Sequence, residues 1–206
     1  TFSVTVLPRI LGQIQGNATK THTVIHTRNT PGIVDAIQLQ QFDLGIVSRS
    51  PPYEGVHILY HTSVNYVALI PSEHELAAST GEIDLDRVAT QHEFVTFGNV
   101  YPLEMQGMEE KLSEHLQQNA RFSVANVLTA SSLVRETGIP AIVDPFSARM
   151  TLDQGGVVIR SLQQNLRYHI AIITRGVDTM TQETRQLAEA LITGFQADPI
   201  IIAAAN

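Results

Sequence analysis

One acidic side chain, that of Asp144, lies at a position where its charge could meet a ligand. Residues 139–143 form a short, apolar, β-branched run, which indicates a buried strand, and the run ends at Asp144 followed by Pro145. The residue before a proline is kept out of helical geometry, so we expect Asp144 at the carboxyl end of the strand, followed by a loop. In open α/β sheets, ligands bind just outside strand carboxyl ends. Asp144 is therefore a candidate partner for a cationic group.

Three predicted helix N-termini offer the opposite kind of group. Thr1 and Ser3 are capping residues at the start of one helix, and Asn29 and Asn126 are capping residues at the start of two others. Free backbone N–H groups and a positive dipole end suit a carboxylate. Together with Asp144, these positions match a zwitterionic or amino-acid-like ligand. The alternative, which the residues leave open, is that each is only a helix cap and that residues 124–150 are an ordinary helix–strand unit.

Hydrophobic spacing predicts the elements that position these groups. Apolar residues at helical spacing predict helices over residues 1–15, 83–89, 105–118 and 181–196, and helices that begin at Asn29 and at Asn126, the latter ending at Gly138. Apolar runs predict strands over residues 21–27, 42–47, 57–60, 65–70, 93–97, 121–124, 157–161 and 168–174. The final helix is expected to pack on the first lobe, and the tail from residue 197 receives no assignment.

The order of these elements predicts two α/β lobes joined by two crossovers, with a ligand cleft between them. The polar segment 71–80 is expected to be the first crossover, and the strand over 168–174 to carry the chain back. We therefore predict one subdomain from residues 1–71 and 178–206 and a second from residues 72–177.

Composition excludes several classes of function. The chain has 206 residues, no Cys, 13 basic residues and a net charge of −7. Disulfides, Cys-ligated zinc, iron–sulfur clusters and thiol catalysis are excluded, and direct nucleic-acid binding is disfavoured because phosphate contacts need concentrated positive charge. No apolar run has the length of a membrane span. The first residue is Thr, so we expect the sequence to be a piece of a longer protein.

Motifs for catalysis and cofactors are absent from the sequence. It contains no Walker loop, no dinucleotide glycine fingerprint and no nucleophile elbow. His22 and His26 share one face of the predicted strand over 21–27, too far apart for easy chelation, and Glu73-His74-Glu75 suits a solvated loop. We expect no metal, no cofactor and no enzyme activity, although a Ser/His/Asp triad could be recognised only by its geometry.

Two stretches and the opening helix carry a family resemblance. The helix contains Leu-Pro-Arg-Ile-Leu at residues 7–11, residues 41–46 read Gln-Phe-Asp-Leu-Gly-Ile, and residues 67–76 read Val-Ala-Leu-Ile-Pro-Ser-Glu-His-Glu-Leu. Over nearly its whole length the chain resembles the effector-binding domain of LysR-type transcriptional regulators. Glu75 stands where the family usually has proline. Residues 138–148 resemble the subgroup that senses basic amino acids and opines, most closely the regulators of nopaline and octopine catabolism.

The resemblance implies a type II periplasmic-binding-protein-like α/β fold, in which two Rossmann-like subdomains joined by two crossover strands enclose a cleft. It implies a cytoplasmic homodimer or homotetramer that binds a small-molecule effector, with DNA bound only through a winged helix-turn-helix that this chain lacks. The family's first strand, before Thr1, is also missing. By match, the effector contacts are Thr1, Phe2, Ser3, Asn29, Thr30, Ser48, Thr96, Phe97, Asn126, Asp144, Pro145 and Phe146.

Two other classes of protein share such a cleft. The first alternative is the solute-binding protein of an amino-acid or opine transporter, and the second is an enzyme built on the same fold. A winged-helix segment upstream in the intact gene would favour the regulator, a signal peptide would favour the transporter, and turnover of a bound ligand would favour the enzyme.

Overall fold

Two strands, β2 (His57–Asn65) and β8 (Arg167–Thr174), carry the chain between its two compact units. The structure is a computed structural model that describes residues 1–14, 22–48, 51–97 and 108–204. Unit 1 comprises residues 65–168 with Thr1, and unit 2 comprises residues 2–64 and 169–206. The chain thus changes unit within β2 and within β8, earlier than the predicted boundaries after residues 71 and 177.

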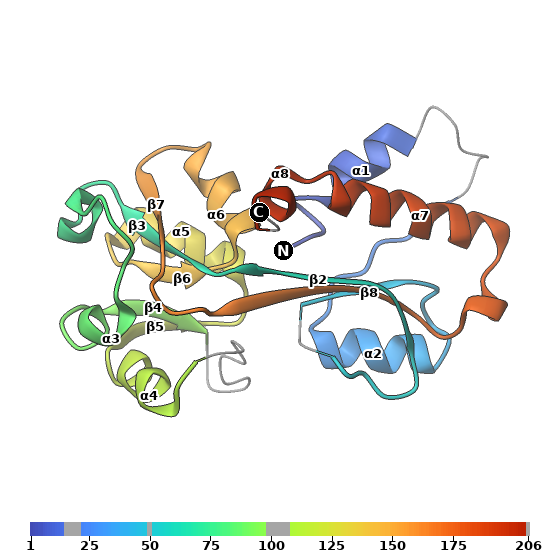
Figure 1. The fold of residues 1–206 in the computed structure, drawn as a ribbon, viewed down its shortest axis with the longest axis horizontal. Coiled ribbons are helices and arrows are strands. Elements are labelled where there is room, and N and C mark those ends of the chain that lie inside the picture. The colour runs from blue at the N-terminus through green and yellow to red at the C-terminus, as the bar shows by residue number, and fades with distance from the viewer. Residues whose placement is uncertain (15–21, 49–50, 98–107, 205–206) are drawn as a thin grey trace. The chain divides into compact units, whose positions relative to one another are not determined.

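Unit 1 is built on a five-stranded sheet with the order β5-β4-β6-β3-β7 (Figure 1). Its strands are β3 (Val67–Pro71), β4 (Phe94–Phe97), β5 (Ala120–Val124), β6 (Ala141–Val143) and β7 (Val157–Ser161). β4 runs parallel to β5 and β6, whereas β3 runs antiparallel to β6 and β7. The carboxyl ends of β4, β5 and β6 therefore lie at the same edge of the sheet as the amino end of β3.

Helices cover both faces of this sheet. The helical elements of unit 1 are η1 (Glu75–Ala78), α3 (Leu85–Val88), α4 (Glu110–Gln118), α5 (Val127–Thr137) and α6 (Pro145–Leu152). Successive side chains of a strand point to opposite faces. Accordingly, Leu69 packs in one buried cluster with Ala130 and Val134 of α5, and its neighbours Ala68 and Ile70 pack in a second cluster that contains residues of α3 and α4.

Unit 2 contains a three-stranded sheet with the order β1-β8-β2, in which β1 (Gly45–Val47) runs antiparallel to β8. Its helical elements are α1 (Leu7–Ile14), α2 (Thr30–Gln38), η2 (Val177–Thr179), α7 (Gln182–Gln196) and α8 (Pro199–Ala204). Ile37 of α2 packs with Val47 and Ile173 in a buried cluster. α1 approaches α7 closely at Gly194, where a Cβ atom would lie 2.5 Å from Cγ1 of Ile10.

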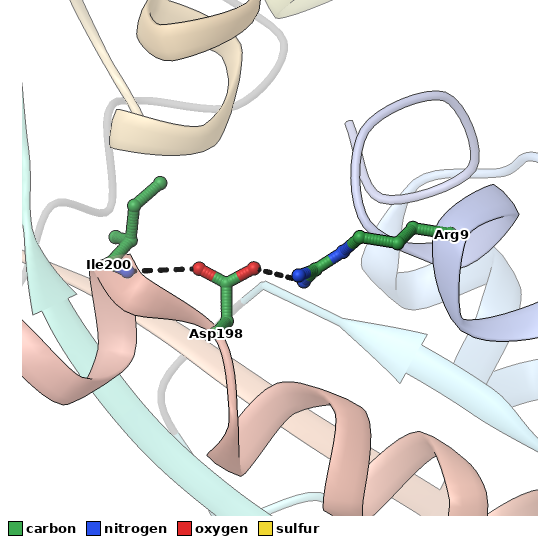
Figure 2. Close-up of polar contacts among 3 residues, drawn as sticks. All are labelled: Arg9, Asp198 and Ile200. Carbon is green, nitrogen blue, oxygen red and sulfur yellow. Dashed lines mark hydrogen bonds and ion pairs between the residues drawn. The ribbon is translucent and has the colours of Figure 1, made fainter. Parts of the chain in front are cut away.

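An ion pair joins α1 to the start of α8 within unit 2. Arg9 donates to Oδ2 of Asp198 at 2.5 Å, and the backbone N–H of Ile200 donates to Oδ1 of the same carboxylate at 3.0 Å (Figure 2). The Asp198 side chain is 8% exposed and that of Arg9 is 46% exposed. Asp198 therefore caps α8 with one oxygen and binds a cation with the other.

Most of the predicted elements are confirmed, with shifted ends. Asn29 and Asn126 cap α2 and α5, and Gly138 ends α5 in the left-handed conformation at φ 76°. The predicted strands over 57–60, 65–70, 93–97, 121–124, 157–161 and 168–174 correspond to β2 to β5, β7 and β8, and the one over 139–143 to β6. The predicted helices over 83–89 and 181–196 correspond to α3 and α7, and α7 contacts α1 in unit 2 as expected. The predicted crossover at 71–80 contains η1.

Four of the predicted helices and strands are corrected. The first helix begins at Leu7 and not at Thr1, because Phe2 and Val6 are buried and residues 2–6 turn to place them there. Residues 22–29 belong to neither a helix nor a strand, since they pair with no neighbouring strand among the described residues. The strand predicted over 42–47 is only β1. The helix predicted over 105–118 begins at Glu110 in the described chain, and residues 15, 21 and 105–107 of these predictions lie outside it.

The predicted loop after Asp144 is a helix. Asp144 has extended backbone angles, φ −68° and ψ 149°, and caps α6, with Pro145 at the first position of the helix. Proline costs nothing there, because the first N–H groups of a helix have no partner within it. The extended backbone that a proline imposes on the preceding residue therefore belongs here to a helix N-cap. The same dipeptide, Asp198-Pro199, begins α8 in the tail that the sequence left unassigned.

Candidate functional site

The predicted site residues of unit 1 lie at the edge where the parallel strands end. β4 ends at Phe97, which pairs with Val124 at the end of β5, and β6 ends at Val143, which pairs with Val67 at the start of β3. The helices α5 and α6 begin directly after β5 and β6. Asn126 and Asp144, the caps of these helices, are thus presented at the edge where α/β folds bind ligands.

Asp144 is fully buried at this edge, with an exposed fraction of 0%. Its Oδ1 accepts a hydrogen bond of 2.9 Å from the backbone N–H of Ser147, and its Oδ2 accepts one of 3.3 Å from the hydroxyl of Thr1. Burial raises the pKa of the carboxyl above its usual value, whereas the hydrogen bonds from Ser147 and from the Thr1 hydroxyl act in the opposite direction. The raised pKa identifies a carboxylate poorly compensated for its burial.

Three aromatic rings of unit 1 contact one another, and one of them, Tyr66, is close enough to Asp144 to be affected by its charge. Tyr66 meets Tyr168 edge to face, with ring centroids 5.3 Å apart, and Phe146 lies 6.5 Å from Tyr168. The pKa of Tyr66 is raised, first by burial and second by the negative charge of Asp144. Sequence reasoning named Phe146 but missed both tyrosines. The signal for Tyr66 is the antiparallel register, which sets the residue before Val67 beside the residue after Val143.

The other predicted residues of unit 1 differ in their exposure and in their hydrogen-bond partners. Asn126 is exposed, and its Oδ1 accepts from the N–H and the hydroxyl of Thr129 at 2.9 and 3.0 Å. Thr96 is buried, and its hydroxyl lies 3.1 Å from that of Ser123, between β4 and β5. Pro145 is half-buried and begins α6. Of these, Asn126 is the residue best placed to meet a ligand, while Thr96 has a structural role within the sheet.

Unit 2 brings a second group of predicted residues together. Asn29 is exposed, and its Oδ1 accepts from the N–H of Gly32 at 3.0 Å. The N–H of Ser48 lies 3.5 Å from the hydroxyl of Thr30, and the hydroxyl of Thr27 donates to that of Ser3 at 3.3 Å. Phe2 is different, since it is buried with its ring edge-on to Phe195. The structure therefore divides the predicted site into two polar groups, one in each unit, and makes Phe2 part of the core.

The chemistry open to these groups is binding. Helix N-termini, hydroxyls and amides can accept a carboxylate, and a buried carboxylate can attract a cation. No group of three or more side chains of the metal-ligand types lies close enough to hold a metal ion in the part of the chain that the structure describes.

Comparison with known proteins places this arrangement in a family. The family model of the LysR substrate binding domain matches residues 1–196. The chain belongs to this family. No protein with curated annotation matches the sequence. None of the helices in the described ranges is long and apolar enough to cross a membrane.

Solved structures with the same fold agree with this assignment. The C-terminal domain of a probable LysR family transcriptional regulator from Rhodococcus sp. RHA1 is similar with a TM-score of 0.73 and 14% identity, over 92% of this chain and 93% of that one. The effector-binding domain of QuiR in complex with shikimate has a TM-score of 0.73 and 16% identity, over 94% and 91%. The reduced form of OxyR has a TM-score of 0.72 and 15% identity, over 93% and 90%. The likeness is one of fold, the type II periplasmic-binding-protein-like α/β fold that the sequence predicted.

Proposed function

We propose that this LysR substrate-binding domain senses an opine or another basic amino-acid derivative, such as nopaline or octopine. The observation that carries the proposal is the buried carboxylate of Asp144 at the strand edge of unit 1, the same edge at which exposed Asn126 begins α5. A ligand with both a carboxylate and a guanidinium or ammonium group has the two charges that these positions favour. The QuiR domain, a structural relative, is bound to shikimate, which supports a small carboxylate as the general class of effector.

The negative charge of Asp144 can act without direct contact. At about 6 Å and an effective dielectric constant of about 20, two unit charges attract by about 3 kcal/mol. Asp144 is fully buried, and its two carboxylate oxygens accept hydrogen bonds from Ser147 and Thr1, so we expect a ligand cation to interact with its charge without direct contact. The aromatic faces add a further preference for a cation over a neutral group.

The rest of the proposal concerns the intact regulator. The chain carries a net charge of −7, so we expect DNA to be bound by a separate winged helix-turn-helix segment and the effector-bound domain to act through a homodimer or homotetramer. The chain would then be a non-catalytic sensor. The transporter alternative predicts the same ligand without any effect on DNA binding.

Calorimetric titration of the purified chain with octopine, nopaline, arginine and shikimate tests the ligand class. We expect Asp144→Asn to weaken binding of the cationic ligands by about 2–3 kcal/mol, or about 30- to 150-fold. The amide keeps an acceptor for the Ser147 N–H, so the cap should survive. Unchanged affinity in Asp144→Asn, within about threefold, would reject the role assigned to its charge.

A matched control separates charge from capping. Asp84 caps α3 in unit 1 and accepts from the N–H of Asp86 at 3.1 Å, so Asp84→Asn makes the same chemical change at another helix start. We expect it to leave the affinity for octopine or arginine unchanged. Shikimate has no cationic group, so its affinity, if measurable, should not fall in Asp144→Asn. If only shikimate binds, the basic-ligand proposal is wrong and the effector belongs to the acidic class.

A further inference from the structure

A pair of histidines lies at the turn after β3, away from the residues predicted to bind the effector. His74 precedes η1 (Glu75–Ala78), and its Nδ1 accepts a hydrogen bond of 3.2 Å from the backbone N–H of Leu76. The His92 ring lies 5.3 Å from the His74 ring between centroids. Nδ1 of His92 lies 3.4 Å from the carboxylate of Glu75. One histidine thus caps the short helix, and the other contacts the carboxylate that follows the cap.

The hydrogen bond to Leu76 fixes the protonation state of His74. An imidazole nitrogen accepts a hydrogen bond only when it carries no proton, so Nδ1 of His74 is bare and any proton is on Nε2. A second proton would turn the acceptor into a donor that faces the N–H of Leu76. Protonation therefore removes the cap, which a Ser, Asn or Asp at the same place would keep at any pH near neutrality.

The groups around the His74 ring shift its protonation equilibrium in both directions. Burial lowers the pKa of His74 first, and the neighbouring His92 lowers it further, while Glu75 raises it. From β7, Arg160 donates to the carbonyl oxygens of Ala77 and Ser79, each at 2.7 Å, and so holds the far end of η1. Glu73, exposed in the turn before His74, is the remaining charged residue of this segment.

We propose that His74 and His92 form a proton-operated catch that holds η1 against unit 1 and releases it when His74 takes up a proton. Leu76 packs against the buried cluster that contains Ile70 and Leu85, so release would expose apolar surface. Arg160 stays attached to the carbonyl oxygens of Ala77 and Ser79, which limits the opening to Glu75 and Leu76. The proposal is independent of the effector, since none of these residues belongs to the predicted site.

The direction of the pH effect follows from the lowered pKa of His74 in the folded chain. The unfolded chain binds the proton more tightly than the folded chain, so the contribution of the cap is complete above about pH 6.5 and is lost as the pH falls below it. The catch is therefore closed at neutral pH and open in mild acid.

Amide hydrogen exchange followed by NMR on the full chain tests the proposal. After correction for the intrinsic pH dependence of exchange, we expect the protection of the Leu76 amide to fall about fivefold between pH 7.5 and pH 5.5, the factor that corresponds to loss of an N-cap. The Thr129 amide, capped by the non-titrating Asn126, is the internal reference and should keep its protection. Protection of Leu76 that does not change with pH, or that falls in parallel with Thr129, would overturn the proposal.

Two variants make the test specific for the proton. His74→Asn supplies an acceptor that does not titrate, so Leu76 should be protected equally at both pH values. His92→Gln removes the neighbouring positive charge, so the midpoint of the fall should move to higher pH, which a purely structural contact would not cause. A parallel fall in His74→Asn would show that His74 does not operate the catch, and an unmoved midpoint in His92→Gln would overturn the part of the proposal that includes His92.

Discussion

Asp144 in unit 1 and Asp198 in unit 2 occupy the same dipeptide, Asp-Pro, and each begins a helix. In both, one carboxylate oxygen accepts the N–H of the first turn, from Ser147 at 2.9 Å and from Ile200 at 3.0 Å. The second oxygen differs. That of Asp198 binds the guanidinium of Arg9, whereas that of Asp144 accepts the hydroxyl of Thr1. The dipeptide thus determines the cap, and its surroundings determine how the charge is balanced.

This difference separates a structural carboxylate from a candidate for function. A buried charge that is paired contributes little net stability but is costly to unpair. Asp198 is such a paired charge, and Arg9 supplies its compensation within unit 2. Asp144 accepts one helix N–H, from Ser147, and one hydroxyl, from Thr1, and neither donor carries a charge, so the proposed ligand cation would supply the compensation that Arg9 gives to Asp198.

The largest effect is expected from removing the Asp144 side chain. Asp144→Ala deletes the cap and leaves the N–H of Ser147 buried without its acceptor, which should lower the free energy of unfolding by about 3 kcal/mol. Urea denaturation measures the change. A loss below about 1 kcal/mol would mean that water reaches the Ser147 N–H. Asp144 would then contribute no more to stability than an exposed cap such as Asn126.

A smaller loss is expected from unpairing Asp198. Arg9→Met keeps much of the alkyl chain but leaves the carboxylate, 8% exposed, without its cation. Arg9 itself is 46% exposed, so solvent screening reduces the effect to about 1–2 kcal/mol in urea denaturation. If Arg9→Met were neutral while Asp198→Ala was costly, the hydrogen bond from the Ile200 N–H alone would account for the stability that Asp198 contributes.

The secondary structure of this fold was largely predictable because its signals are local. Asn126 and Gly138 bracket α5, and the apolar runs of β2 to β8 lie near their predicted places. The errors arise where tertiary packing decides. Phe2 packs edge-on against Phe195, so the chain turns before the first helix, and α1 begins only at Leu7. Residues 22–29 have the composition of a strand but pair with no strand among the described residues. The Asp-Pro starts of α6 and α8 were a missed local signal, whereas the capping residue Asn29 correctly predicted the start of α2.

The site was only partly predictable, for a physical reason. Spacing along the chain placed Asp144 and Asn126 at strand ends, because parallel strands share an edge. It could not show that Asp144 is fully buried or that Tyr66 lies beside it, since both depend on the antiparallel register of β3 against β6. Nor could it separate Thr96, whose hydroxyl serves the pairing of β4 with β5, from residues free to meet a ligand.

The burial of Asp144 also predicts a response of stability to pH. The raised pKa of Asp144 means that the folded chain binds a proton more tightly than the unfolded chain at this carboxyl. Its contribution to the free energy of unfolding therefore increases as the pH falls from neutrality toward the usual carboxyl pKa of about 4. We expect the stability difference between the wild-type chain and Asp144→Asn to shift in favour of the wild type as the pH falls from 7 to 5, measured by urea denaturation at both pH values. A constant difference across this range would show that Asp144 does not titrate there.

The smallest effect is expected at the exposed, neutral cap. Asn126→Ala removes the acceptor of the Thr129 N–H, but water can replace it because Asn126 is exposed, so the loss of stability should be about 0.5–1 kcal/mol. Thr181→Ala is the matched control, since Thr181 caps α7 and accepts from the N–H of Thr184 at 3.2 Å. Both variants should lose similar stability in urea, but only Asn126→Ala should also weaken octopine binding in calorimetry, because α5 begins at the proposed site. Equal stability losses with unchanged octopine affinity would assign Asn126 to capping alone and leave Asp144 as the only tested effector residue of unit 1.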